Sequence, residues 1–485
     1  MQEGVQSTAS YGDLFREGRA SITVAIFSLI ALFATDVWAV GTVLPTILRE
    51  LGGVEFYGWV IGAYCLGNLI TIPLLSVLAE KIGVRSCLMI GALFFFTGAT
   101  TSALATEMEW IVLGRFVQGL GAGSFSSSTF RIISRFYPSD IQPRAVGVVS
   151  AIWGVAAVGG PLVGAGILSL LGWRWIFWYD LPVGGCILSL TFWALRKEES
   201  PAHPDTEVDF LGPPLFAVST GLVLAGCYSE LPLNVILVAG GIILYALFRI
   251  HEGRHNSPVI HPDVWKIGRP LGIAVMGTAL LTISYGGAET FLPLLVQGVW
   301  QGSPLEAGFI LTMGSIGWSL SSLIAPRFAQ YPRILIIAGT LTVLCGLCAL
   351  AAVTHFELSI YLLYPAWFVV GLGIGQAFPT LNTLVLDNER DYAAGVATGA
   401  FLLSSTWGFA IGPLVAGLVA QIGFDQGFDP RMVGHGALSS QAVTALEGGG
   451  VYAILTSVPI AIILLVFALK APARRQVAQT VSERE

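Results

Sequence analysis

The chain has 485 residues, of which 54% are hydrophobic and 11% are charged, with a formal net charge of −6 and a mean hydropathy of +0.76. Soluble domains carry about 25% charged residues, so this composition excludes an ordinary soluble protein. No basic surface with interleaved aromatic residues is evident, and we expect no nucleic-acid partner. The net charge says little about other partners, because most of the chain is apolar.

Apolar runs of about 20 residues, long enough to cross a hydrocarbon layer, recur along the whole sequence. The first 20 residues are polar and the first apolar run has full spanning length, which does not fit a cleavable signal peptide. We predict an all-α membrane protein. Its fourteen predicted spans are residues 22–44, 56–78, 86–106, 110–133, 145–169, 175–195, 209–229, 232–249, 271–296, 303–326, 333–353, 360–384, 394–421 and 449–470.

The basic residues predict the orientation. An even number of spans puts both termini on one side, and of the 24 Lys and Arg residues only Arg49, Arg174 and Arg431 fall in gaps on the other side. This bias predicts a multi-pass plasma (inner) membrane protein with both termini in the cytoplasm. The longest outer loop, 422–448, has the Gly, Asp and Ser content of a solvated loop or a partly ordered lid.

One segment occurs twice. FVQGLGAG at 116–123 returns as FVVGLGIG at 368–375, and Gly160-Pro161 returns as Gly412-Pro413 at the same offset of 252 residues. A duplicated helical membrane protein is typical of a transporter whose site lies between its halves. The predicted domains are an N-terminal six-helix bundle (1–200), two linker transmembrane helices with a cytoplasmic segment (201–265) and a C-terminal six-helix bundle (266–485).

Two ionisable residues lie deep in predicted spans of the first half. At 1.5 Å per residue, Asp36 and Arg115 both lie roughly 21 to 22 Å from the cytoplasmic face. A buried carboxyl that exchanges protons beside a guanidinium meets the physical requirement for proton coupling. The alternative is a static ion pair that holds two helices together. In the second half, Trp367 stands in the place of Arg115.

Two further acids are less easily interpreted. Glu289 maps through the repeat to position 37, next to Asp36. It is a candidate contact for a cationic substrate or a second proton site, and the alternative is a hydrated structural acid near the outer mouth. Asp180 follows Arg174 at the outer interface, where we expect it to pair with Arg174 or to cap a helix rather than to touch substrate.

The cytoplasmic turn after the second span is a candidate for conformational control. It carries Glu80, Lys81, Gly83 and Arg85. Such a turn can latch neighbouring helices in one state and release them in another. An ordinary charged turn that follows the orientation rule explains the same residues equally well.

The fifth span is crowded with small residues. Gly160, Pro161 and Gly164 permit close helix approach and a bend. The matching Gly412-Pro413 pair favours symmetry-related helices that slide or seal. Any helix bundle can use such glycines for packing alone.

Two motifs of other protein classes fail. His251-Glu252-Gly253-Arg254-His255 matches the H-E-x-x-H zinc-protease pattern, but it leaves an apolar span into a segment with Gly253 and Pro258, where no helix presents both histidines. The G-x-x-x-x-G-K-[ST] motif of ATP-driven transport is absent from the sequence. We expect no enzyme activity, no metal and no cofactor.

Several motifs together resemble the 14-helix drug/proton antiporter family of the major facilitator superfamily, over nearly the whole chain. They are Asp36 with Pro45 nine residues later, the 68–85 segment, Arg115-Phe-Val-Gln118-Gly119, the run from Gly154 to Gly166, and Trp173-Arg174-Trp175 with Leu181-Pro182. The chain departs from the family pattern at Trp38, Gly41 and Asp180, where Thr, Asn and Asn are usual. The resemblance implies the major facilitator fold, with two six-helix bundles plus two linker transmembrane helices.

The resemblance also implies a proton-coupled exporter of lipophilic, often cationic, drugs or toxic compounds. It would work by alternating access, as a monomer surrounded by membrane lipid. Aromatic side chains offer apolar and cation–π contacts to such substrates. The candidates are Trp38, Trp153, Trp318, Trp367 and Trp407. Two alternatives stay open: an exporter of a lipid or amphiphilic metabolite and, from another class, a non-transporting membrane sensor.

Overall fold

The computed structural model describes residues 11–16, 18–138, 141–196, 209–254, 264, 266, 269–328, 330–388, 396–424 and 440–472. Within these residues the chain forms helices and no strand. The predicted domain boundaries at 200/201 and 265/266 fall in or beside stretches outside the described residues, and they stay predictions.

The first half consists of helices α1 to α7. An α-helix satisfies its own backbone hydrogen bonds, as a span in lipid must. Gly52, Gly83 and Gly172, which end three of these helices, have φ of 75°, 85° and 89°, a region that favours glycine. The helices are α1 (Ala20–Leu51), α2 (Tyr57–Ile82), α3 (Val84–Ala103), α4 (Met108–Phe136), α5 (Gln142–Leu171), α6 (Trp175–Trp178) and α7 (Asp180–Ala194).

The remaining helices form a linker pair and the second half. The linker pair is α8 (Gly212–Cys227) and α9 (Leu233–Glu252). The second half is α10 (Pro270–Gly298), α11 (Pro304–Ile324), α12 (Pro332–His355), α13 (Leu363–Asn388), α14 (Val396–Phe424) and α15 (Ser440–Ala468).

The membrane prediction is confirmed. In the described residues, twelve helices are long and apolar enough to cross a membrane. The other two predicted spans are also helical: α4 carries several charged residues, and α8 has only 16 residues. The predicted loop at 422–448 is too long, because α14 continues to Phe424 and α15 already begins at Ser440. Residues 425–439 lie outside the described residues.

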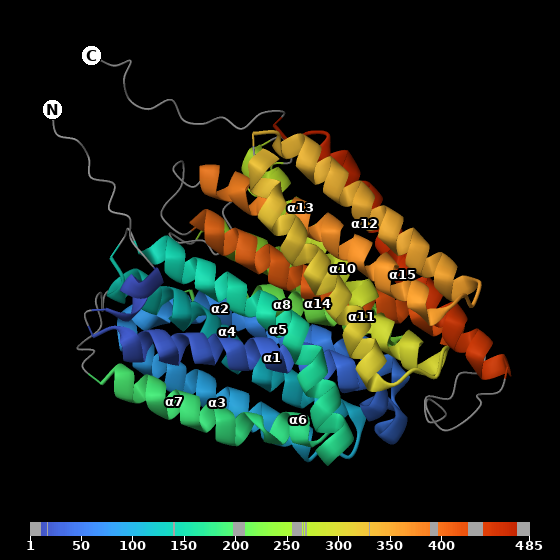
Figure 1. Cartoon of the computed structure of the whole chain (residues 1–485), viewed down its shortest axis with the longest axis horizontal. Coiled ribbons are helices and arrows are strands. Elements are labelled where there is room, and N and C mark those ends of the chain that lie inside the picture. The colour runs from blue at the N-terminus through green and yellow to red at the C-terminus, as the bar shows by residue number, and fades with distance from the viewer. Residues whose placement is uncertain are drawn as a thin grey trace.

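The two halves meet at one end of the molecule. We call the end at which α1 begins and α15 ends the terminal end, and the other the opposite end. The helices of the halves run at an angle and spread apart toward the terminal end (Figure 1). Contacts between the halves lie from the middle of the helices toward the opposite end. Ser315 of α11 donates to the Ala157 carbonyl of α5 at 3.1 Å, and Gln297 of α10 donates to the Thr42 carbonyl of α1 at 3.3 Å.

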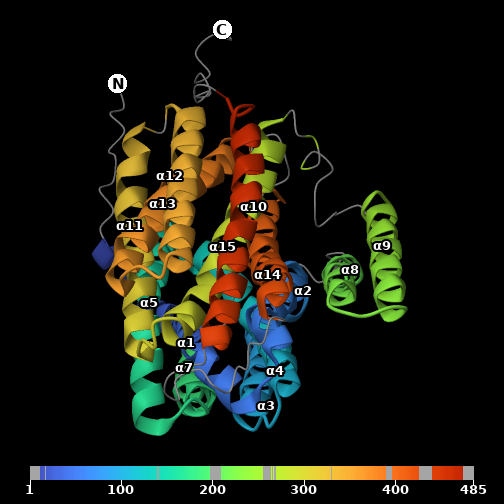
Figure 2. The ribbon, with the colours of Figure 1, turned by 90° about the vertical axis from the view of Figure 1, so that its right-hand side faces the viewer.

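The linker pair α8–α9 lies to one side, with α8 next to α2 and α9 outermost (Figure 2). The Tyr228 hydroxyl at the end of α8 donates to the Leu414 carbonyl of α14. At the terminal end, His251 of α9 bonds Asp209 at 2.8 Å. The motif that resembles a zinc protease therefore has its first histidine engaged in joining α9 to the start of α8. His255 lies outside the described residues.

The repeated glycines pack the same helix pairs in both halves. A Cβ atom on Gly119 of α4 would collide with the Tyr64 carbonyl oxygen of α2, and one on Gly371 of α13 would collide with the Gly314 carbonyl oxygen of α11. Only glycine lets these backbones approach so closely. The repeat seen in the sequence is therefore a repeat of helix contacts.

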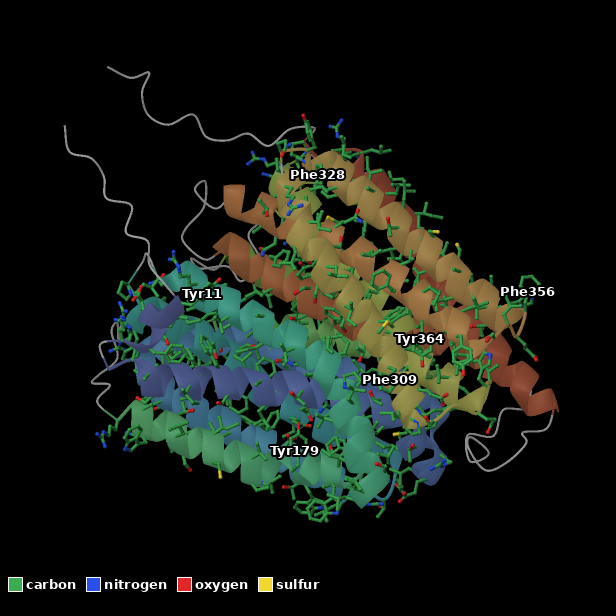
Figure 3. The ribbon with its side chains drawn as sticks, in the orientation of Figure 1. Tyr11, Tyr179, Phe309, Phe328, Phe356 and Tyr364 are labelled. Atoms are coloured by element: carbon green, nitrogen blue, oxygen red, sulfur yellow. The ribbon has the colours of Figure 1, made fainter. Side chains whose placement is uncertain are left out.

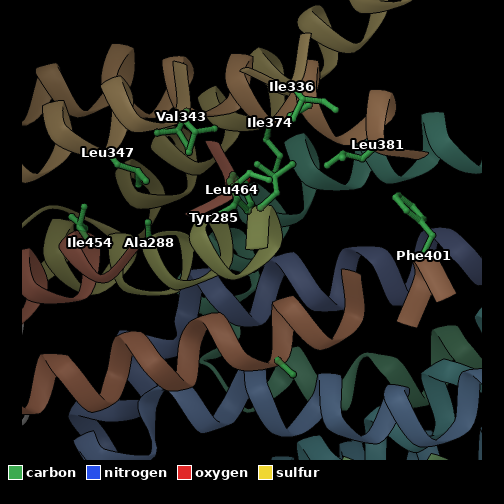
Figure 4. Close-up of a cluster of buried hydrophobic side chains, with 14 of the residues drawn as sticks. Tyr285, Ala288, Ile336, Val343, Leu347, Ile374, Leu381, Phe401, Ile454 and Leu464 are labelled. Carbon is green, nitrogen blue, oxygen red and sulfur yellow. The ribbon is translucent and has the colours of Figure 1, made fainter. Parts of the chain in front are cut away.

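Buried apolar side chains fill the interior of each half. In the second half, Tyr285 and Ala288 of α10 lie among Ile374 of α13 and Leu464 of α15 (Figure 4). Large apolar side chains are also exposed on the outside, such as Phe356, which projects from the edge of the second half (Figure 3). An apolar exterior suits a protein surrounded by lipid.

Candidate functional site

A fully buried polar cluster lies where three helices of the first half meet. α1 contributes Asp36, α4 contributes Arg115 and Gln118, and α7 contributes Asp180; all four are 0% exposed. Gln118 follows Arg115 by three residues, so the two side chains share one face of α4. Asp180 lies in the first turn of α7, and the backbone at Tyr179 before it is helical, with φ of −66° and ψ of −26°.

Asp36 and Arg115 form a direct ion pair. Arg115 Nη1 donates to Asp36 Oδ2 at 2.8 Å. The sequence predicted only a matching depth, and the structure brings the two side chains together. Either charge alone would be very costly in a fully buried site, so each requires the other or a replacement such as a proton or a ligand.

Gln118 connects this pair to a second carboxyl group. Its Oε1 accepts from Arg115 Nη1 at 2.8 Å. Its Nε2 donates to Asp180 Oδ2 at 2.9 Å and to Asp36 Oδ1 at 3.3 Å. One amide thus faces a cation with its oxygen and two carboxyl groups with its NH₂, which fixes the orientation of the side chain.

The prediction for Asp180 was wrong. Arg174 pairs with Glu50 of α1 at 2.5 Å, and both side chains are exposed at the opposite end. Trp173 donates to the same Glu50 at 2.7 Å. Helices α6 and α7 run on through a helical backbone at Tyr179, with φ of −66° and ψ of −26°, so Asp180 lies about 9 Å further along the span than Arg174. The interface assignment left out this rise along the helix.

Tyr64 of α2 completes the cluster. The Arg115 Cζ atom lies 4.1 Å from the centre of the Tyr64 ring, a cation–π distance. Arg115 Nε and Nη2 have no hydrogen-bond partner within the described part of the chain. The cluster holds two carboxyl groups and one guanidinium, so it carries an excess negative charge unless a proton or a cation binds. Neither Tyr64 nor Gln118 was singled out from the sequence; only the place of Gln118 in the α4 motif pointed to it.

Glu289 lies in a separate, aromatic setting in the second half. It follows Tyr285 by one turn on α10, and its Oε1 is buried without a hydrogen-bond partner among the described residues. The Tyr285 ring stacks on Trp367 of α13 at 5.1 Å and meets the edge of Trp318 of α11 at 5.7 Å. A carboxyl group beside aromatic faces offers the contacts that a lipophilic cation needs.

At the place that corresponds to the Asp36–Arg115 ion pair, the second half has aromatic packing instead. Arg115 of α4 reaches Asp36 of α1, whereas Trp367 of α13 stacks on Tyr285 of α10. Since α4 and α13 carry the repeated motif, these are corresponding helix pairs. Among the described residues, this carboxyl–guanidinium pair joins α1 and α4 and has no counterpart between α10 and α13.

The other predicted tryptophans do not join this aromatic group. Trp153 of α5 packs against Phe33 of α1 with ring centres 5.1 Å apart. The Trp407 indole of α14 donates to Thr220 of α8 at 3.1 Å, so it turns toward the linker pair. Of the five candidates, the structure places two beside Tyr285 and distributes the others elsewhere.

The small residues of α5 bring helices together. A Cβ atom on Gly160 would lie 2.6 Å from Cβ of Trp38 on α1, and Gly164 faces α1 in the same way. The Pro161 carbonyl faces Gly308 of α11, across the boundary between the halves. Their predicted role in sliding or sealing stays a prediction, with this contact as its setting.

The charged turn lies at the terminal end, between α2 and α3. Gly83 has φ of 85°, and Lys81 and Arg85 are exposed. The Arg85 Cζ lies 5.8 Å from the ring centre of Phe192 on α7. The side chain of Glu80 lies outside what the structure describes. The latch remains a hypothesis.

An apolar cavity of about 400 Å³ lies between α2, α4 and α8. Its walls include Trp59, Leu66, Phe116 and Leu222, and Glu109 is the one charged side chain that lines it among the described residues. The cavity faces the linker pair and does not include the polar cluster.

Comparison with known proteins gives the family. Residues 26–424 match the model of the Major Facilitator Superfamily. The chain belongs to this superfamily. As a member of the superfamily it is a multi-pass membrane transporter and not an enzyme, and the predicted resemblance and fold are confirmed.

Relatives in this superfamily carry multidrug names. The chain is 27% identical to "Multidrug resistance protein 3" of Bacillus subtilis over 405 residues, 80% of this chain and 77% of the relative. It is also 27% identical to "Multidrug transporter protein MdtP" of the same organism over 429 residues, 83% and 76% of the two chains.

Solved structures share the fold at low identity. A bacterial homolog of the human lysosomal transporter Spinster, in an inward-facing conformation, matches with a TM-score of 0.63 at 14% identity, covering 94% of this chain and 97% of that one. A D-xylose–proton symporter matches with a TM-score of 0.63 at 13% identity, covering 94% and 98%.

Proposed function

We propose that this transporter exports lipophilic compounds, many of them cationic, in exchange for protons. The observation that carries the proposal is the buried Asp36–Arg115 ion pair, which is 0% exposed and extended by Gln118 to a second carboxyl group. A cluster with one more acid than base exchanges charge with whatever enters it, a proton or a cation. A static staple needs no such excess charge.

The substrate class rests on separate support. Relatives at 27% identity are named for multidrug resistance and multidrug transport. Glu289 beside the aromatic group of Tyr285, Trp318 and Trp367 suits a lipophilic cation through charge and cation–π attraction. In this proposal Asp36 and Arg115 handle the proton, and Glu289 handles the charge of the substrate.

In this proposal, the substrate crosses the membrane by alternating access. The basic residues of the sequence support cytoplasmic termini in a plasma (inner) membrane. With that orientation the halves touch at the outer end and spread toward the cytoplasm, as in an inward-facing state (Figure 1). The proton gradient would then drive return to this state after release outside. We expect a monomer in contact with membrane lipid.

Transport by the purified protein in lipid vesicles tests the proposal. With an imposed pH gradient, the wild type should move the fluorescent lipophilic cation ethidium and move protons in the opposite direction. Asp36→Asn should abolish both movements, whereas Glu50→Gln, an exposed acid outside the cluster, should retain them. Ethidium transport that ignores the pH gradient, or full coupled transport by Asp36→Asn, would contradict the proposal.

A second candidate is export of a lipid or amphiphilic metabolite. The cavity between α2, α4 and α8 favours it, because its walls are almost entirely apolar and one acid, Glu109, lines it. The same vesicles, loaded with neutral and lipid-like compounds, separate the candidates. Proton movement with a lipid-like compound alone would favour this alternative, and none with any compound would favour a membrane sensor.

A further inference from the structure

We propose that Asp180 is a second proton-binding carboxyl group of the cluster, and that Asp36 and Asp180 together hold one proton in this state, resting on Asp180. The inference names the proton carrier for the exchange proposed above, and for its role in transport it rests on that function. The Asp36–Arg115 pair by itself does not require Asp180 to take part.

The two carboxyl groups have different hydrogen-bond partners. Asp36 accepts from the Arg115 guanidinium at 2.8 Å and from the Gln118 amide at 3.3 Å. Asp180 accepts from Gln118 at 2.9 Å, and its other close neighbours are the Asp36 carboxyl group and the Tyr179 hydroxyl, neither of which carries a positive charge. Its other oxygen, Oδ1, is buried and has no hydrogen-bond partner in the described part of the structure. Asp36 therefore has the partners of a carboxylate, and Asp180 has an open position for a proton.

The surroundings supply no second positive charge. The charged and titratable groups that face Asp180 are Asp36 from α1, Arg115 from α4, Tyr64 from α2 and its own neighbour Tyr179. Arg115 is the single cation among them, and its ion pair is with Asp36. Two ionised carboxyl groups beside one guanidinium would leave a net negative charge in a fully buried site, which is costly. One bound proton makes the cluster neutral.

The net charge of the cluster depends on this one proton. With the proton the cluster is neutral, and without it the cluster carries one negative charge. Loss of the proton therefore creates the charge that attracts a cation or pulls Arg115 toward Asp180. Gln118 has one N–H for each carboxyl group, so it holds both in place in either state.

Infrared spectroscopy of the purified full chain at pH 7 counts protonated carboxyl groups, because their carbonyl stretch is separate from that of carboxylates. Asp180→Asn should lose one protonated carboxyl group relative to the wild type. Arg115→Met should gain one, because both acids then need a proton. Glu50→Gln, an exposed acid at the opposite end, should leave the count unchanged. Asp36→Asn does not serve as a control, because Arg115 would then turn to Asp180 and release its proton.

The outcomes separate this inference from the proposed function. An unchanged count in Asp180→Asn means that Asp180 holds no proton and overturns the inference, whatever the vesicles show. If Asp180→Asn does not fold, Arg115→Met decides, because an unchanged count there removes the charge argument. A lost proton in Asp180→Asn together with wild-type transport that ignores the pH gradient would keep the proton site and reject the exchange.

Discussion

Replacing Arg115 by methionine tests the central ion pair. The variant leaves Asp36 buried without its cation, and we expect a carboxyl group of the cluster to take up one more proton than in the wild type. An aspartic acid in water titrates near pH 4, so keeping it protonated at pH 7 costs about 1.36 kcal/mol for each of three pH units, or about 4 kcal/mol. This value lies within the range of about 3 to 5 kcal/mol for breaking a buried pair.

The stability of the Arg115→Met variant should depend on pH. The folded variant holds a proton that the unfolded chain releases above about pH 4, so its stability falls as the pH rises. Relative to the wild type, the loss should be about 4 kcal/mol at pH 7 and about 1.4 kcal/mol at pH 5. Thermal unfolding in detergent at the two pH values measures this difference through the unfolding midpoint.

Two control variants complete the test. Arg174→Met removes an exposed pair with Glu50, which is worth about 0 to 1 kcal/mol, and its effect should not depend on pH in this range. The double variant Arg115→Met with Asp36→Asn should lose the additional pH dependence. If Arg115→Met instead follows the pH profile of the wild type, no extra proton is bound and the charge argument is wrong.

Three further predictions concern other parts of the molecule. Glu289→Gln should reduce transport of ethidium several-fold more than transport of a neutral compound in the same vesicles, and equal losses would place Glu289 in the coupling machinery. Gly119→Ala should destabilise the protein by about 1 to 3 kcal/mol in thermal unfolding, because its Cβ would collide with the Tyr64 carbonyl. Gly166→Ala, with open space at the same atom, should be neutral or slightly stabilising. Gly83→Val should strain a backbone at φ of 85° and shift spin-label distances across the terminal end, and unchanged distances would reject the latch.

The sequence predicts how deep in a span a residue lies, but it does not predict which neighbouring helix the side chain faces. The ends of an apolar run and the rise per residue place Asp36 and Arg115 at one level, and the structure joins them at 2.8 Å. These helices are apolar on nearly all sides, so hydropathy does not say which neighbour a side chain faces. The sequence therefore predicts the same role for Trp407 and Trp367, yet Trp407 faces α8.

Asp180 shows a second limit. The interface assignment treats the start of this span as one level, but a helical rise of 1.5 Å per residue puts Asp180 about 9 Å further in than Arg174. Two residues of the same segment consequently reach different partners: Arg174 meets Glu50 in the exposed region, and Asp180 meets Gln118 in the interior. The rise per residue accounts for the difference in depth, and the structure adds the partners of each side chain.

The glycine contacts between α2 and α4, and between α11 and α13, determine which helices move together. Backbones that touch directly leave no side chains to change rotamer, so each pair moves as one piece. Amide hydrogens on the contact faces of α4 and α13 should then exchange slowly with deuterium in every transport state. The largest changes in exchange should occur where the two halves touch, on α2 with α14, α5 with α11 and α1 with α10.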